Sequence, residues 1–185
     1  LSPWMQKLPG GLIHVNVVGC ALFAAISGSS AATVATVGKM SIPELRKRKY
    51  PEKILLGSLA GSGTLGLLIP PSIILIIYGV AVQESIAKLF IAGIIPGIMI
   101  ALIFMSYVII WSLINKKEMP KILEEYSFFE KIKRSKQLLP VILLILAVIG
   151  SIYTGVATAT EAASLGVVGA LILSFFQKSL NLDTF

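Results

Sequence analysis

The chain has 185 residues, of which 56% are hydrophobic and only 14% are charged, whereas an ordinary soluble domain carries about 25% charged residues. This composition excludes an ordinary soluble enzyme domain and predicts an all-α integral membrane protein. The net charge of +7 comes from two basic stretches, residues 39–53 and 116–137, and basic loops between apolar segments are typical of cytoplasmic loops beside anionic lipid rather than of a nucleic-acid-binding surface.

Residues 11–40 change from apolar to small and polar side chains in the middle of the segment. Residues 11–26 are apolar, and small hydroxyl-bearing residues follow from Ser27 onward. Irregular backbone at membrane depth survives only where protein or a wet cavity surrounds it. Residues 11–40 are therefore predicted to form a re-entrant hairpin with its tip at Ser27–Ser30, and residues 1–10 the cytoplasmic segment that leads into it. The alternative is a plain membrane crossing with a small-residue packing face.

Two pairs of residues match the capping box, in which a hydroxyl and a carboxylate three residues later satisfy free N–H groups at a helix start. One pair is Ser41 and Glu44, at the beginning of the predicted basic cytoplasmic loop 41–53, and the other is Thr158 and Glu161. Both pairs are predicted to be structural caps. For Glu161, a role as an ion or proton ligand is the alternative.

Residues 54–82 form an apolar stretch long enough to cross a membrane, but glycines and two prolines interrupt its middle. Proline lacks an N–H and clashes with the carbonyl four residues earlier. Pro70 therefore frees the carbonyl of Gly66, and Pro71 frees that of Leu67. Because the residue before a proline also avoids the α region, we predict that residues 54–82 form a broken transmembrane helix.

Such a break offers two kinds of binding site. Freed carbonyl oxygens suit a hard cation such as sodium, and free N–H groups at the start of the second half-helix suit an anion. No charged side chain occurs between residues 54 and 83, so an anionic substrate would need bound cations to offset its charge. The alternative is a proline kink whose freed groups are satisfied by neighbours. The chain has no phosphate-binding loop motif, so ATP is not predicted as the energy source.

The remaining segments alternate between apolar and charged sequence. Residues 83–115 are predicted to form a transmembrane helix, 116–137 an amphipathic cytoplasmic arm, 138–156 a further transmembrane helix, and 157–185 the start of the next transmembrane helix. Since both basic loops are placed on the cytoplasmic side, the turn at Glu84 is predicted to face the opposite side.

Two other classes of membrane protein make different demands on the sequence. An intramembrane serine protease needs its nucleophile and its base in contact. The single histidine, His14, lies 15 positions before Ser29, which is roughly 22 Å along a helix, so an enzyme is not predicted. A channel needs a continuous polar path, whereas the hydroxyl groups here cluster at one depth. A channel-like membrane subunit remains an alternative.

Four segments carry a family resemblance: residues 23–33 (FAAISGSSAAT), 63–72 (GTLGLLIPPS), 88–97 (KLFIAGIIPG) and 153–163, which contains YTG and TEAA. They resemble the large membrane (permease) subunit of the tripartite ATP-independent periplasmic (TRAP) transporters, in the order of that family and over nearly the whole chain. One departure is Ala159, where the family usually has proline before Thr-Glu-Ala-Ala. This change should soften the turn without touching the ion site.

The resemblance implies an elevator-type transporter of the ion transporter superfamily, built from two inverted repeats that each supply one hairpin and one broken helix. Only one such pair is present, and the chain opens on Leu1 without an initiating methionine. It is therefore expected to be part of a longer protein with its second half beyond Phe185. The coupling ion, sodium, is expected between the hairpin tip and the helix break. The ligands implied for sodium are Ser27, Ser29, Gly66, Ile69 and Pro71, and the candidates for substrate contact are Ser30, Thr33 and Ser72.

The resemblance also implies partners and a location. The partners would be a small membrane subunit and a periplasmic binding protein that delivers a carboxylate-bearing organic anion. The location would be the cytoplasmic (inner) membrane of a bacterium or archaeon, crossed several times. The alternative within the same superfamily is a sodium:dicarboxylate-type symporter that works without a binding protein.

Overall fold

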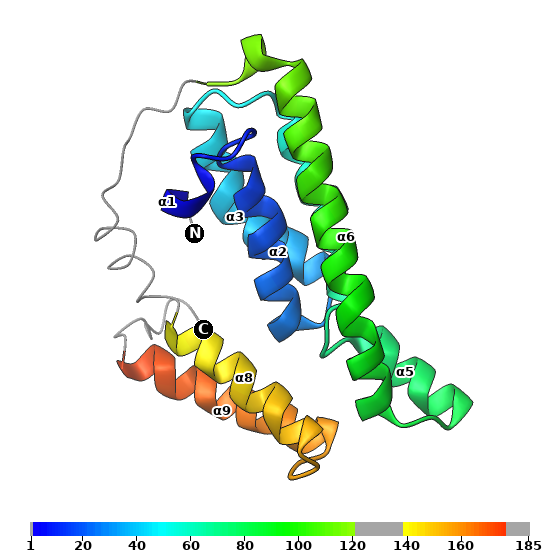
Figure 1. Cartoon of the computed structure of the whole chain (residues 1–185). Coiled ribbons are helices and arrows are strands. Elements are labelled where there is room, and N and C mark those ends of the chain that lie inside the picture. The colour runs from blue at the N-terminus through cyan, green and yellow to red at the C-terminus, as the bar shows by residue number, and fades with distance from the viewer. Residues whose placement is uncertain (1, 121–138, 177–185) are drawn as a thin grey trace. The chain divides into compact units, whose positions relative to one another are not determined.

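The computed structural model describes residues 2–120 and 139–176, and every regular element within these ranges is a helix. The all-helical fold predicted from the sequence is therefore confirmed for the described part of the chain (Figure 1). The chain divides into two compact units, Leu1–Lys131 and Ile132–Phe185, and each unit is described by itself below.

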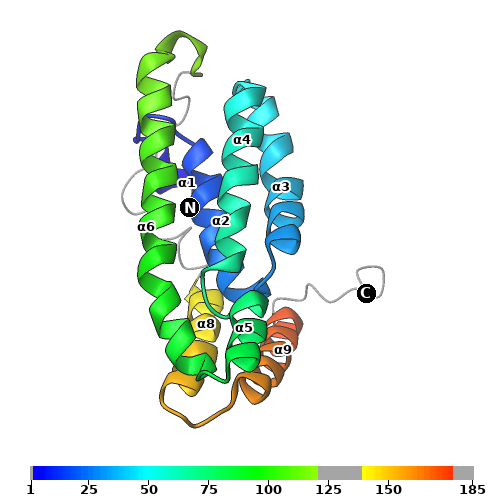
Figure 2. The same ribbon diagram turned by 90° about the vertical axis from the view of Figure 1, so that its right-hand side faces the viewer.

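The first unit is built around three packed helices: α2 (Ile13–Ser27), α3 (Ser30–Lys47) and α4 (Glu52–Gly63). A short helix, α1 (Ser2–Met5), precedes them. Figure 2 shows α2, α3 and α4 side by side, with α2 and α3 joined by a tight turn. Three clusters of buried apolar side chains hold these helices together. The first consists of Leu12, Ile13, Leu45, Ile54, Leu55 and Val108. The second consists of Val17, Ala24 and Leu65, and the third of Cys20, Val37 and Leu59.

Helix α3 continues through most of the segment predicted to be a basic loop. Only residues 48–51 separate α3 from α4. The predicted capping box of Ser41 and Glu44 is not formed: Ser41 lies inside α3, and Glu44 accepts a hydrogen bond from Arg48 Nε at 2.6 Å. The physical reason is tertiary packing, because Leu45 is 2% exposed within the first apolar cluster and keeps this last part of α3 against its neighbours.

The predicted interruption of residues 54–82 is observed. Helix α4 ends at Gly63, a 3₁₀ turn (η1) covers Thr64–Leu67, and the second half-helix, α5 (Ile73–Val82), begins only at Ile73. Residues 68–72 between them are not helical. The structure therefore places the break where the two prolines remove N–H donors from the chain.

Helix α6 (Ile86–Ile114) is 29 residues long and runs without interruption through Pro96. Among the described residues it is the one helix that is long and apolar enough to cross a membrane by itself. Many of its large apolar side chains are exposed, among them Ile95, Leu102 and Ile110, as expected for a surface that contacts lipid. A 3₁₀ turn, η2 (Lys116–Glu118), follows it. From residue 121 onward, the predicted amphipathic arm lies outside the described residues.

The second unit is a pair of packed helices, α8 (Leu139–Tyr153) and α9 (Ala159–Phe176). At the start of α9, Glu161 Oε2 accepts from the backbone N–H of Thr158 at 2.8 Å, and Thr158 Oγ1 accepts from the N–H of Glu161 at 3.3 Å. These two bonds are the reciprocal pair of a capping box. Residues 177–185 of the predicted last segment lie outside the described residues.

Candidate functional site: the hairpin tip and the helix break

The turn between α2 and α3 consists of two residues with contrasting backbone conformations. Gly28 has φ 59°, a left-handed conformation that favours glycine, and its N–H donates to the carbonyl of Ala24 at 3.0 Å. Ser29 is extended and caps α3, because its Oγ accepts from the N–H of Ala32 at 3.4 Å. The sequence Ser-Gly-Ser-Ser thus forms a compact helical hairpin tip, with Ser30 as the first residue of α3.

A small network of hydroxyl groups lies just behind this tip. Ser27 Oγ and Thr33 Oγ1 are 2.9 Å apart, and Thr33 Oγ1 donates to the carbonyl of Ser29 at 2.7 Å. Ser27 Oγ also contacts the Ser29 carbonyl at 3.3 Å. Thr33 is fully buried. Thr33 was a candidate for substrate contact, and its hydroxyl bonds to Ser27 and Ser29, the two tip residues that the resemblance implied for sodium.

The two carbonyl groups freed by the prolines differ in whether they accept a hydrogen bond. Ser72 Oγ donates to the carbonyl of Leu67 at 2.6 Å, so one of the two oxygens freed by the prolines is satisfied. The N–H of Ile69 donates to the carbonyl of Leu65 at 2.8 Å. Within residues 2–120 and 139–176, no N–H donates to the carbonyl of Gly66. A cation is a suitable partner for such an oxygen.

The tip and the break are in direct contact. The N–H of Ile73, the first residue of α5, donates to the carbonyl of Gly28 at 3.3 Å. A Cβ added to Gly66 would lie 2.9 Å from both the carbonyl carbon and the carbonyl oxygen of Ser29. A Cβ added to Gly28 would lie 2.6 Å from the carbonyl oxygen of Pro71. Glycine at these positions therefore allows two irregular stretches of backbone to meet.

Helix α6 supports the break from another side. A Cβ added to Gly93 would lie 2.8 Å from the carbonyl oxygen of Leu68, and one added to Gly97 would lie 3.0 Å from Ile69 Cγ1. These two glycines are four residues apart, so they share one face of α6. The sequence alone gave these two glycines no predicted role, although their Gly-x-x-x-Gly spacing is the pattern of close helix packing in membranes.

A second polar contact fixes α2 against α4. The fully buried Asn16 donates from Nδ2 to the carbonyl of Leu55 at 3.2 Å and to Ser58 Oγ at 3.0 Å. Ser62, one turn further along α4, is also fully buried and donates to the carbonyl of Ser58. Sequence alone could not predict that Asn16 contacts Ser58, because 42 positions separate the two residues.

Most of the residues implied by the resemblance therefore gather at one place. Hydrogen bonds link Ser27, Ser29 and Thr33 at the tip. On the break, Gly66 and Pro71 lie against the tip backbone. The described residues contain no group of three or more His, Cys, Asp or Glu side chains that could hold a metal ion. A cation bound here would therefore be held by neutral oxygens of hydroxyls and carbonyls.

The start of α5 differs in part from the predicted anion site. The N–H of Ile73 is used by the hairpin, and the cap residue Ser72 makes no side-chain bond to the α5 backbone, since its hydroxyl turns to Leu67. Ser72 is fully buried. An anion at this helix start would therefore depend on the N–H groups of the following residues, Ile74 and Leu75.

Comparison with known protein families gives a match over almost the whole chain. Residues 5–185 match the family described as "Tripartite ATP-independent periplasmic transporter, DctM component". The chain is 40% identical over 175 residues to the C4-dicarboxylate TRAP transporter large permease protein DctM of Pseudomonas aeruginosa, covering 94% of the chain and 40% of that protein.

Two further relatives have other transported compounds in their names. The ectoine/5-hydroxyectoine TRAP transporter large permease protein UehC of Ruegeria pomeroyi is 38% identical over 92% of the chain and 39% of that protein. The sialic acid TRAP transporter permease protein SiaT of Haemophilus influenzae is 38% identical over 95% of the chain and 28% of that protein. The chain thus spans less than half the length of these curated relatives.

Proposed function

Because the chain belongs to the DctM component family of the tripartite ATP-independent periplasmic transporters, we propose that it forms part of a sodium-coupled permease subunit that imports a carboxylate-bearing organic anion. Membership of this family indicates a membrane permease rather than an enzyme. The observation that carries the proposal is the contact between the hairpin tip and the helix break, where the Gly28 carbonyl accepts from Ile73 and Gly66 lies against Ser29.

Sodium would lie between these two elements. The Gly66 carbonyl is the best-suited ligand, since no N–H of the described residues uses it. Ser27 supplies a hydroxyl within the same cluster, and the backbone oxygens of Ile69 and Pro71 complete the set on the break. The carbonyl of Ser29 already accepts from Ser27 and Thr33, so Ser29 would contribute more through its hydroxyl. Thr33 would orient Ser27.

The anion would lie beside the sodium, near the start of α5. Ser30 at the start of α3 and the residues after Ser72 are the candidates for contact with its carboxylate. No charged side chain occurs between residues 54 and 83, so the bound cation would supply the positive charge that the anion needs. This pairing would couple the two solutes without ATP. The relatives named for C4-dicarboxylates and sialic acid both transport carboxylates.

The hairpin would enter the membrane and return to the same side. Helix α2 has 15 residues, which is about 22 Å of helix, whereas the hydrocarbon core of a bilayer is about 30 Å thick. Both hairpin ends would lie in the cytoplasm with the basic residues that follow α3. Transport would follow an elevator movement of tip and break together in the inner membrane, with a small membrane subunit and a periplasmic binding protein as partners.

The test is uptake by proteoliposomes that contain the full-length protein together with its small membrane subunit, with and without a sodium gradient. The substrates would be succinate and sialic acid, each offered with and without its binding protein. We expect uptake only with sodium and with the binding protein. Uptake that needs sodium but no binding protein would favour the sodium:dicarboxylate-type symporter. Uptake that ignores sodium would contradict the proposed coupling and favour a channel-like subunit.

A further inference from the structure

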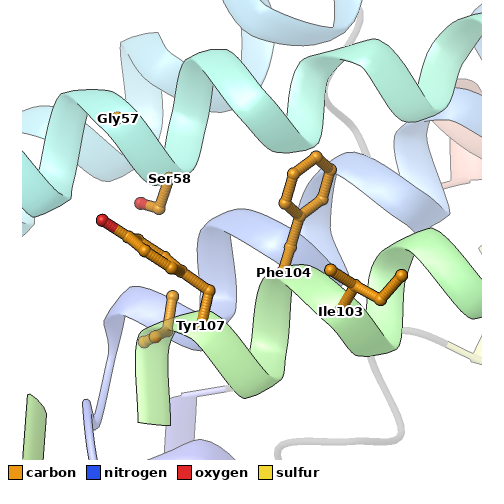
Figure 3. Close-up of a pocket in the computed structure, with 6 residues that line it drawn as sticks. Gly57, Ser58, Ile103, Phe104 and Tyr107 are labelled. Atoms are coloured by element: carbon orange, nitrogen blue, oxygen red, sulfur yellow. The ribbon is translucent and has the colours of Figure 1, made fainter. Parts of the chain in front are cut away.

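A separate hollow lies between α4 and α6, away from the tip and the break. We call it the α4–α6 groove; it has a volume of about 290 Å³ and is lined by Gly57, Ser58, Ile103, Phe104, Tyr107 and Val108. In Figure 3, the side chains of Ser58 and Tyr107 face each other across it, with Phe104 further along α6. Its size is near the lower end of ligand pockets, which run from about 300 to 1,000 Å³.

The groove is open above Gly57 and closed one turn later. A Cβ added to Gly57 would have no heavy atom within 4 Å, whereas one added to Gly61 would lie 3.3 Å from the ring of Phe104. The hollow therefore ends where Phe104 packs against α4. An occupant would lie along α4 toward the start of that helix, near Glu52.

The groove offers an occupant almost no unsatisfied hydrogen-bonding groups. Its lining is aliphatic or aromatic apart from two hydroxyl groups. The hydroxyl of Ser58 is already satisfied, because it accepts from Asn16 Nδ2 at 3.0 Å and donates to the carbonyl of Leu55 at 3.0 Å. Tyr107 is 58% exposed at the rim. An apolar chain suits this lining, because the Ser58 hydroxyl keeps its partners and the Tyr107 hydroxyl lies at the exposed rim.

Positive charge lies at one end of the groove. Lys53 precedes Gly57 by four residues on α4, so the two share a face of the helix. Lys53 is exposed, and no hydrogen bond or ion pair reaches it within residues 2–120 and 139–176. Its neighbour Glu52 does not neutralise it, because that carboxylate is bound by Arg46 Nε at 2.7 Å.

The end of α6 reaches the same place. Ile54 of α4 and Val108 of α6 belong to one apolar cluster, against which Trp111 and Met119 also pack. The start of α4 and the end of α6 are therefore adjacent, and Lys116 and Lys117 follow α6 there, with Glu118 as the acidic residue of the same turn. Basic residues beside Trp and Tyr are typical of the boundary between lipid tails and the cytoplasm.

We infer that the α4–α6 groove binds one acyl chain of an anionic phospholipid whose phosphate is held by Lys53, with Lys116 and Lys117 adding to the attraction. The apolar lining accounts for the chain, and the exposed Lys53 one helical turn away accounts for the headgroup. A helix of a partner subunit could also cover an apolar face, but Lys53, which is exposed and has no ion pair within residues 2–120 and 139–176, favours a lipid. This inference does not depend on the sodium site.

The test uses the purified full-length protein in detergent, titrated with palmitoyl-oleoyl phosphatidylglycerol or with the zwitterionic phosphatidylcholine of the same chains. Native mass spectrometry counts the bound lipids. Gly57→Leu and Ile103→Trp fill the groove from opposite walls, and Gly57→Ala is the matched control that adds only one methyl group. Lys53→Gln removes the charge and leaves the groove open.

We expect both filling variants to lose the tightest-bound lipid of either headgroup, while Gly57→Ala retains it. Lys53→Gln should keep the phosphatidylcholine but lower the preference for phosphatidylglycerol about fivefold, as expected for one lysine near a membrane surface. Unchanged lipid counts and an unchanged headgroup preference in Gly57→Leu, Ile103→Trp and Lys53→Gln would overturn the inference. So would loss of a co-purifying membrane subunit from the filling variants with lipid binding intact, because the groove would then be a protein interface.

Discussion

Any residue other than glycine at position 66 would require the neighbouring backbone to move. Any Cβ there would meet the backbone of Ser29, including its carbonyl carbon and oxygen at 2.9 Å. Backbone atoms cannot rotate away as the end of a flexible side chain can, so the tip and the break would have to separate. This single residue therefore links the local geometry of the break to the proposed ion site.

The first prediction concerns the variant Gly66→Ala. Overpacking of this kind costs about 1–3 kcal/mol, and it should abolish sodium-dependent uptake because the tip no longer lies against the break. The measurement is initial uptake rate in proteoliposomes together with stability in detergent. Gly57→Ala is the matched control, since a Cβ there meets nothing within 4 Å. Equal uptake by Gly66→Ala and the control would remove Gly66 from the proposed site.

The second prediction concerns the hydroxyl of Thr33. The variant Thr33→Val keeps the branched shape but removes the bonds to Ser27 and to the Ser29 carbonyl. Since one hydrogen bond contributes about 1 kcal/mol and only the bond to Ser27 orients a proposed sodium ligand, we expect about a fivefold rise in the sodium concentration for half-maximal uptake. Thr36→Val, at an exposed position of the same helix, should leave it unchanged. If the two variants behave alike, Thr33 has no role in orienting Ser27.

At the scale of the helices, a buried polar contact joins α2, which ends at the tip, to α4, which ends at the break. Asn16 bridges these helices through Leu55 and Ser58 and is fully buried. Our third prediction is a favourable coupling between Asn16→Ala and Ser58→Ala, measured as free energies of unfolding in a double-mutant cycle. Polar contacts of this kind between membrane helices contribute about 0.6 kcal/mol on average. Strictly additive effects would show that the bridge does not stabilise the packing.

The sequence predicted those elements whose cause is local. The break follows from the missing N–H groups of Pro70 and Pro71, and the tip follows from small residues that are poor against lipid. The end of α3 was not predictable in this way, because the burial of Leu45 overrides the capping pattern at Ser41. The roles of Gly93 and Asn16 arise from contacts between distant segments, which local sequence does not specify.

At the scale of the whole molecule, the proposed re-entrant hairpin makes a topological prediction. Residues Lys7 and Lys49 should lie on the cytoplasmic side and Glu84 on the other side. In the full-length protein in cells, a membrane-impermeant maleimide applied from outside the inner membrane should label Glu84→Cys. Lys7→Cys and Lys49→Cys should react only after permeabilisation, and the buried Cys20 gives little background. Labelling of Lys7→Cys from outside would instead indicate a plain crossing.

The central claim is that the tip and the break together hold the coupling sodium ion, and equilibrium binding of radioactive sodium to the purified full-length protein tests it most directly. Ser27→Ala removes a ligand from the tip, Gly66→Ala displaces the ligand on the break, and Gly57→Ala leaves both in place. We predict that the first two variants lose a sodium ion that the wild type and Gly57→Ala retain. Wild-type sodium binding in both Ser27→Ala and Gly66→Ala would contradict the account.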